Sequence, residues 1–124
     1  MLKVALVDDS PEVRGALRSL LGLIEGVQVV GAAGDGAEAL RLIRDTDPDV
    51  VMLDVVLHGR DDGFEVLRQV KARQPRTAVI VLSHIGWPAM RDRFLGAGAQ
   101  AYFDKGLQFM QALEWIRERA ARAA

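Results

Sequence analysis

A short apolar run that ends in a carboxylate limits the folds open to this chain more than any other feature. Residues 50–53 (VVML) are followed directly by Asp54, and Pro48 and Asp49 stand before them. Four apolar residues between turn residues are typical of a strand buried on both faces, as in a parallel sheet. A charge inside such a strand is costly. We therefore expect Asp54 at the carboxyl end, where open α/β sheets bind ligands.

Four further apolar runs repeat this pattern, and segments with helical spacing lie between them. We predict strands over residues 4–7, 27–32, 50–53, 78–82 and 101–103. Ser10 before Pro11 marks a helix start, and Asp35 with Glu38 has the spacing of a capping box. Strands alternating with helices indicate an α/β protein with a parallel sheet covered on both faces and right-handed crossovers. We predict a flavodoxin-like (βα)5 three-layer sandwich with strand order 2-1-3-4-5.

Polar side chains at the strand ends converge in this topology. Asp8 and Asp9 follow the first strand, which neighbours the third, so they are expected beside Asp54. Ser83 and Lys105 follow the fourth and fifth strands and face the same edge. Three carboxylates, a hydroxyl and an ammonium thus come together from distant parts of the sequence.

This set of groups suits phosphoryl transfer. Clustered carboxylates repel one another unless a cation lies among them, and oxygen ligands favour Mg²⁺ over zinc. An aspartate can act as a nucleophile and carry a phosphoryl group, and a metal ion with a lysine can neutralise the charge on its oxygens. The residues predict Mg²⁺-assisted phosphoryl transfer to Asp54.

Composition narrows the class of protein. The 124 residues are enough for one domain with a single core. The net charge of −1 gives no basic field for nucleic acid or an anionic membrane, and no apolar run is long enough to span a bilayer. There is no signal-peptide pattern and no cysteine for a disulfide or thiolate metal site. We expect a cytoplasmic protein that binds neither nucleic acid nor membrane directly.

Over residues 1–124 the chain resembles the receiver domain of two-component response regulators, the CheY-like family. The resemblance rests on several short motifs that occur in the family's order. The matching pieces are Val7-Asp8-Asp9-Ser10, Leu53-Asp54-Val55, Gly63-Phe64-Glu65-Val66-Leu67, Leu82-Ser83, Gly98-Ala99 and Tyr102-Phe103-Asp104-Lys105.

The resemblance implies a phosphoacceptor in a phosphorelay. Asp54 would accept the phosphoryl group from a sensor histidine kinase or a histidine phosphotransfer protein. Asp8, Asp9 and Asp54, with the Val56 carbonyl, would hold Mg²⁺. Self-dephosphorylation is expected to be slow, because Val56 and Ile85, which the resemblance places beside the path of the attacking water, cannot hydrogen-bond a water through their side chains.

The same resemblance implies a switch. Lys105 would bond the phosphoryl group, Ser83 would follow it, and Tyr102 would report it by turning inward. The fourth helix, fifth strand and fifth helix would then present a surface for a partner, an output domain or a second copy. We expect Met110 and Trp115 to point away from the core on that last helix, with Trp115 near the centre of the surface.

Four features depart from the family's pattern. His58 stands where the family often has proline, and Gly106 where a proline often follows the lysine. His84 follows the switch hydroxyl, where a small residue is common, and the segment 54–63 is one residue longer than usual. These departures bear on loop geometry and donor access.

Two alternatives stay open beside the signalling receiver. A degenerate receiver would act as an interaction module without phosphorylation; the intact acids argue against it, and the departures at His58, His84 and Gly106 keep it open. A small Mg²⁺-dependent phosphohydrolase would use an aspartyl intermediate. That enzyme would need a general acid, which would stand two residues beyond Asp54. This position is Val56, which cannot donate a proton, so the sequence argues against the enzyme.

Overall fold

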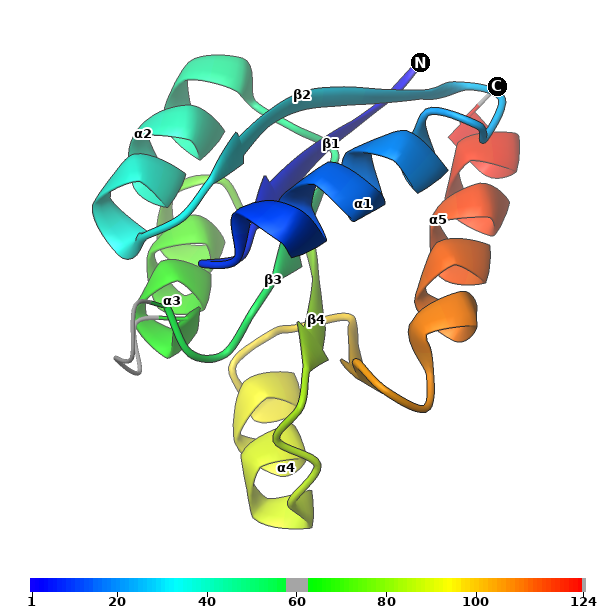
Figure 1. Cartoon of the computed structure of the whole chain (residues 1–124). Helices are drawn as coiled ribbons and strands as arrows, with labels where there is room; N and C mark the ends of the chain where they lie inside the picture. Colours follow the sequence, from blue (N-terminus) through cyan, green and yellow to red (C-terminus); the bar gives the residue numbers. More distant parts are fainter. Residues whose placement is uncertain (58–62, 124) are drawn as a thin grey trace.

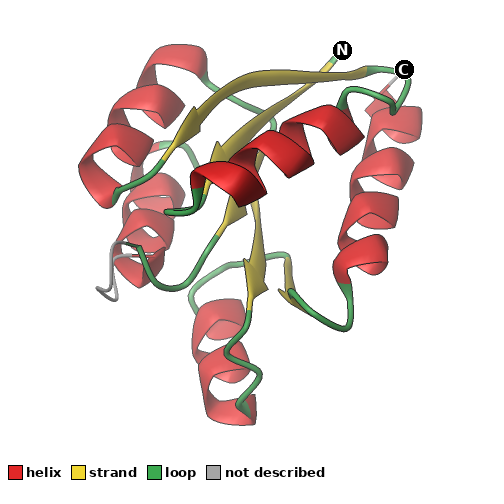
Figure 2. Cartoon of the chain, in the orientation of Figure 1, coloured by secondary structure: helices red, strands yellow, loops and turns green. Residues whose placement is uncertain are grey.

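The computed structural model describes residues 1–57 and 63–123, which form a single sheet with helices on both sides (Figures 1 and 2). Strands and helices alternate along the chain, as predicted. The strands are β1 (Leu2–Val7), β2 (Val27–Ala33), β3 (Val50–Leu53), β4 (Ala78–Ser83) and β5 (Ala101–Asp104). The helices are α1 (Pro11–Leu21), α2 (Gly36–Thr46), α3 (Gly63–Arg73), α4 (Pro88–Gly96) and α5 (Phe109–Ala123).

The five strands are parallel and lie in the order β2-β1-β3-β4-β5, which confirms the predicted topology. Val7 pairs with Leu53 across β1 and β3, and Leu53 pairs with Val81 across β3 and β4. Ser83 pairs with Asp104 at the ends of β4 and β5. This register brings the residues that follow β1, β3, β4 and β5 to one edge of the sheet.

Alternate residues of the central strands serve two separate cores. In β3, Val51 and Leu53 belong to the core under α2, α3 and α4, whereas Val50 and Met52 belong to the core under α1 and α5. Because successive side chains of a strand point to opposite faces, a strand covered on both sides is apolar at every position. This explains why the runs in the sequence are continuous.

Local signals set the helix starts, and packing corrects two expectations. Ser10 and Asp35 cap α1 and α2 through their side-chain oxygens. Helical spacing of the apolar residues between 13 and 24 predicts Ile24 on the apolar face of the first helix, but α1 ends at Leu21 and Ile24 is buried from the turn beyond it. Trp115, expected to point away from the core, instead packs against the α1–α5 core, with the Arg119 guanidinium 5.3 Å from its ring centroid.

Part of the segment that follows Asp54 falls outside the described residues. His58 and the expected lengthening of this segment lie there. Within the residues that are described, the helices are too short or too polar to cross a membrane.

Candidate functional site

Three carboxylates meet at the carboxyl edge of the sheet. Asp8 and Asp9 follow β1, and Asp54 follows β3, its neighbour in the sheet. One oxygen from each carboxylate lies within 4.8 Å of the others. Side-chain exposure is only 5% for Asp8 and 12% for Asp54, so repulsion between these acids is poorly screened by water.

The loop between β1 and α1 is held by its own hydrogen bonds. The Asp8 carboxylate accepts from the Ser10 amide at 2.9 Å, and Ser10 Oγ accepts from the Val13 amide at 3.2 Å. The Arg14 guanidinium donates to the Asp8 carbonyl at 2.6 Å. Sequence reasoning missed Arg14, because its place one turn into the helix after the paired acids does not by itself indicate this contact. These bonds fix Asp8 before any ligand arrives.

Lys105 lies between two of the acids. Its Nζ is 2.6 Å from Asp8 Oδ2 and 3.3 Å from Asp54 Oδ2. Burial by itself would lower the pKa of Lys105, but the hydrogen bond to Asp8 and the charges of Asp54 and Asp8 outweigh it, so the pKa lies above its usual value. The lysine is therefore a fixed positive charge at the acid cluster.

The ionised form of Asp54 is disfavoured where it lies. Burial raises the pKa of Asp54, Lys105 opposes this rise, and the nearby charge of Asp8 adds to it. The hydrogen bond from the Val56 amide, 3.5 Å from Asp54 Oδ1, lowers the pKa of Asp54 and offsets only a little of this rise. Because the net shift is upward, added positive charge at this cluster would favour the carboxylate.

Gly106 has a direct role in the loop that carries Lys105. The Asp104 carboxylate accepts from the amides of Gly106 and Leu107 at 2.8 and 2.9 Å. The Lys105 amide donates to the Ser83 carbonyl at 2.8 Å. A proline at position 106 would lack the N–H that Asp104 accepts. Gly106 therefore supplies a hydrogen bond in the lysine loop that a proline at this position could not make.

Ser83 and Tyr102 meet at the loop between β4 and α4. Ser83 is buried, and its Oγ accepts from the Ile85 amide at 3.1 Å. Tyr102 is 4% exposed and its hydroxyl donates to the Ile85 carbonyl. Burial raises the pKa of Tyr102, although hydrogen bonding with Ser83 opposes the rise. The tyrosine thus already has the inward orientation expected of the switched state.

A pocket of about 250 Å³ opens above the acids. Its lining residues come from the ends of β1, β3 and β4. They are Asp9, Asp54, Val56, Ser83, His84 and Ile85. His84 is exposed, whereas Val56 and Ile85 are partly buried against the core. The two apolar side chains expected beside the water path therefore do lie on the pocket that contains Asp54.

Gly63 allows α3 to begin against the backbone of Asp54. A Cβ at this position would lie 2.3 Å from the Asp54 carbonyl oxygen and 2.7 Å from that of Val55. The Gly63 amide donates to the Val55 carbonyl at 3.1 Å. No side chain fits such an approach. In the sequence, Gly63 stands out only as part of a family motif, which carries no sign of this contact.

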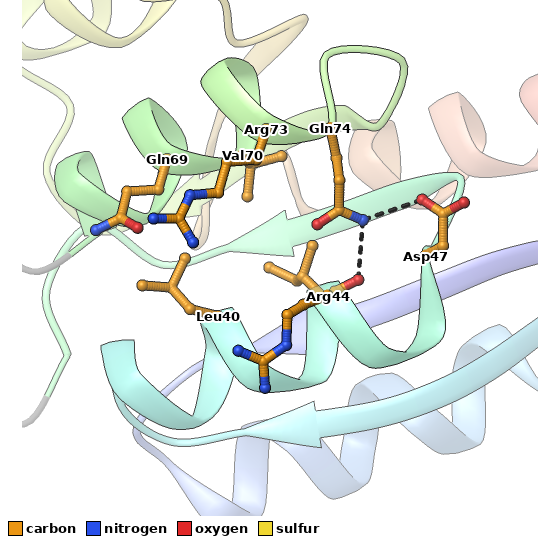
Figure 3. A pocket seen from close by; sticks show the side chains of 8 residues that line it. Leu40, Arg44, Asp47, Gln69, Val70, Arg73 and Gln74 are labelled. Atoms are coloured by element: carbon orange, nitrogen blue, oxygen red, sulfur yellow. Dashed lines mark hydrogen bonds between the residues drawn. The ribbon is translucent and has the colours of Figure 1, made fainter.

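A larger groove, about 600 Å³, lies between α2 and α3 (Figure 3). Gln74 closes one end by donating to the Ile43 carbonyl and to Asp47 Oδ1, both at 3.0 Å. Figure 3 shows Gln69 and Arg73 of α3 facing Leu40 and Arg44 of α2. Among the described residues that line this groove, Asp47 supplies the one carboxylate, and it is hydrogen-bonded to Gln74. Within the described residues, the larger groove therefore has no counterpart to the three converging acids.

The acid cluster fits Mg²⁺ by its donor set. Within residues 1–57 and 63–123, Asp8, Asp9 and Asp54 form the one group of three acidic, histidine or cysteine side chains close enough to share a cation. All its ligand atoms are carboxylate oxygens, which hard divalent cations prefer. Burial is the main cause of the raised pKa of Asp54, and the charge of Asp8 adds to it; a bound cation would oppose both by stabilising the carboxylate.

Comparison with known proteins gives a consistent result. A family model described as the response regulator receiver domain matches residues 4–117. The response regulator GacA of Pseudomonas aeruginosa is 37% identical over 118 residues, which cover 95% of this chain and 55% of that protein. The chain therefore spans about half the length of the curated relatives it matches.

Solved structures agree with this likeness. The response regulator domain of Thermotoga maritima CheB has a TM-score of 0.83 and 28% identity, covering 99% of this chain and 96% of that chain. A complex of CheX with CheY, BeF3 and Mg²⁺ from Borrelia burgdorferi has a TM-score of 0.85 and 25% identity, covering 94% and 87%. Both similarities extend over nearly the whole sheet and its helices.

Proposed function

The chain belongs to the response regulator receiver domain family of two-component signalling, and we propose that Asp54 is its phosphoacceptor. One observation carries the assignment. The carboxylates of Asp8, Asp9 and Asp54 converge within 4.8 Å, and the Lys105 ammonium contacts two of them. We infer that residues 1–124 form one receiver domain. This domain would accept the phosphoryl group on its own Asp54 and would not act as an enzyme on a separate substrate.

Asp8, Asp9 and Asp54, with the Val56 carbonyl, are the groups that would hold Mg²⁺. Bound Mg²⁺ supplies positive charge to the oxygens of the transferring phosphoryl group. Asp8 is held in place by the Ser10 amide at 2.9 Å, so little reorganisation is needed on binding. The Mg²⁺ of the Borrelia burgdorferi CheY complex belongs to that protein and supports the proposal by family likeness.

Phosphoryl transfer would proceed by direct displacement. An Asp54 carboxylate oxygen attacks the phosphorus of a phosphohistidine on a sensor kinase or phosphotransfer protein. The P–O bond forms as the P–N bond breaks, and the electron pair remains on the imidazole nitrogen, which takes a proton from solvent. The Lys105 ammonium pairs with a phosphoryl oxygen, and the Ser83 hydroxyl donates to another.

We propose that α4, β5 and α5 present the surface that reads phosphorylation. Met110 and Leu107 are 72% and 89% exposed near the start of α5, and Trp87 is exposed before α4. Exposed apolar side chains on neighbouring elements suit a partner, an output domain or a second copy. Trp115 is partly buried, so we assign the centre of this surface to Met110. The cytoplasmic location expected from the sequence stays a prediction.

Intact-mass measurement after treatment with acetyl phosphate and Mg²⁺ tests the assignment. We expect one added phosphoryl group on the wild type and none on Asp54→Asn. Asp45→Asn is the matched control, since Asp45 is an exposed aspartate paired with Arg44. Undiminished phosphorylation of Asp54→Asn would overturn the assignment. A wild type that stays unmodified, with this donor and with a phosphorylated histidine phosphotransfer protein, would favour the degenerate receiver.

A further inference from the structure

The peptide groups of Ile85 are held from both sides at the pocket above Asp54. The Ile85 amide donates to Ser83 Oγ at 3.1 Å, and its carbonyl accepts from the Tyr102 hydroxyl. The side chain of Ile85 lines the pocket together with Asp54 and Val56. Two buried partners from β4 and β5 therefore fix the backbone that carries this apolar side chain.

Aromatic packing holds Tyr102 in turn. Phe94 of α4 is completely buried, and its ring centroid lies 5.9 Å from that of Tyr102 in an edge-on arrangement. Phe64 of α3 packs edge-on against Phe94 at 5.2 Å. The Arg93 guanidinium lies over the Phe64 ring, 3.8 Å from its centroid. We call Phe64, Phe94 and Tyr102 the aromatic brace.

Outward movement of Tyr102 would disturb the packing of the brace against α3 and α4. Phe64 directly follows Gly63, whose position is fixed against the Asp54 backbone. Edge-to-face aromatic pairs are favourable beyond the area that they bury. If the Tyr102 hydroxyl moved outward, its hydrogen bond to the Ile85 carbonyl would be lost. The ring packing and the hydrogen bond of the hydroxyl thus both favour the inward orientation of Tyr102.

We propose that Tyr102, held by the aromatic brace, is a positioning residue that keeps Ile85 over the phosphoacceptor pocket and so lengthens the lifetime of the acyl phosphate. The proposal rests on Asp54 being the phosphoacceptor. It adds a role for Phe94, which lies in the core, and for Phe64, which packs against it; neither lines the pocket.

The chemistry gives the reason. In hydrolysis, a water oxygen bonds to phosphorus opposite the Asp54 oxygen as that P–O bond breaks. Inorganic phosphate leaves, the electron pair returns to the Asp54 carboxylate, and the water gives its protons to phosphate and solvent. The side chains of Ile85 and Val56 cannot donate or accept a hydrogen bond. While the brace keeps Ile85 in place, the Ile85 side chain excludes water from the pocket and cannot orient a water molecule for attack.

Tyr102→Phe tests this with the smallest change, because it removes the hydroxyl and keeps the ring. After phosphorylation and removal of the donor, we expect phosphate release to be about three- to tenfold faster than in the wild type, the range set by one hydrogen bond. Ile85→Ala should also accelerate release. Because both changes act through one side chain, the double variant should be no faster than the faster single variant.

A matched pair of phenylalanines controls for loss of stability. Phe94→Leu weakens the brace, whereas Phe103→Leu alters the next residue of β5, which packs against the opposite core. We expect faster phosphate release only from Phe94→Leu. Equal acceleration in both variants, or additive effects of Tyr102→Phe and Ile85→Ala, would overturn the proposal.

Amide hydrogen exchange of Ile85 tests the positioning without phosphorylation. Tyr102→Phe should speed exchange of the Ile85 amide, and Phe103→Leu should leave it unchanged. If the Ile85 amide is unaffected by Tyr102→Phe, the positioning role is wrong whether or not Asp54 is phosphorylated. If Ile85 responds but Asp54 is never phosphorylated, the proposed function fails and the assigned effect on lifetime fails with it.

Discussion

Helices α1 and α4 each follow a loop of the site, but they are held in different ways. Helix α1 has a side-chain cap from Ser10 and buries Leu17 and Leu21. Helix α4 begins after Trp87, which provides no side-chain cap, and within residues 88–96, all of them described, Phe94 alone is buried. The start of α1 is thus fixed by a side-chain cap, whereas α4 has no such cap and buries one ring.

This difference suits the two tasks of a receiver. A carboxylate that is to bind a metal ion, as we propose for Asp8, should be in position before the ion arrives, and the bonds from Ser10 and Arg14 hold it there. An element that responds to phosphorylation needs two states separated by a small free energy, and few contacts make that gap small. We infer that the acid side of the pocket is preorganised and that α4 is the part able to move.

Phe94→Ala should produce the largest difference in stability between α4 and the acid side of the pocket. Loss of a buried phenylalanine side chain costs about 3–5 kcal/mol. Because Phe94 is the one buried residue of the fully described helix α4, we expect α4 to detach while the acid cluster persists. Urea unfolding with amide exchange on the same samples is the measurement. Equal loss of protection in α1 and α4 would mean that the two sides unfold as one unit.

Changing the two apolar residues of the pocket should have the next largest effect. We expect Val56→Asn with Ile85→Glu to speed dephosphorylation by about tenfold, or roughly 1.4 kcal/mol of barrier, because polar side chains can orient the water. A phosphate-release time course measures this. Fast decay in the wild type, or no acceleration in the variant, would show that these residues do not control water access.

Exchanging the helix caps should change stability by about 1 kcal/mol in opposite directions. Ser10→Ala removes the α1 cap that accepts from the Val13 amide and should lower the free energy of unfolding. Trp87→Ser should provide the missing cap and stabilise α4. Chemical denaturation of the two variants is the measurement. If Trp87→Ser destabilises the protein, then packing by Trp87 matters more to α4 than capping.

Asp54→Asn should stabilise the metal-free protein at neutral pH. Burial raises the pKa of Asp54, with a further contribution from Asp8. A raised folded-state pKa gives stability that is complete below the unfolded pKa and is lost as pH rises through the folded pKa. The ionised carboxylate is therefore unfavourable, and Asn removes this cost. Melting temperatures in EDTA should differ at pH 7 and converge in acid; a constant difference would assign the effect to something other than ionisation.

The convergence of acids could be predicted because it depends on topology. Once continuous apolar runs indicate a parallel sheet, Asp8, Asp9 and Asp54 must lie at one edge. Other contacts could not be predicted, because they depend on distances between elements and on side-chain conformation. Arg14 reaches a carbonyl six residues earlier, Gly63 touches the Asp54 backbone, and these contacts leave no composition or periodicity signal.

Exposure on α5 shows a second limit of sequence reasoning. Helical spacing from Phe109 predicts Leu113 and Ile116 on the buried face and Met110 on the exposed one, and the structure confirms all three. The same spacing placed Trp115 away from the core, yet the residue is partly buried and packs against the α1–α5 core beside Arg119. Periodicity gives the direction of a Cα–Cβ bond, but a long side chain can bend away from it.

Amide hydrogen exchange of α1 and α4, with and without Mg²⁺ and beryllofluoride, tests the central claim most directly. We expect α4 to exchange faster than α1 in the free protein and to become more protected with beryllofluoride, while α1 hardly changes. Asp54→Asn should abolish the response of α4. If α1 and α4 exchange alike and neither responds, or if Asp54→Asn responds as the wild type does, then a preorganised acid side coupled to a movable α4 is contradicted.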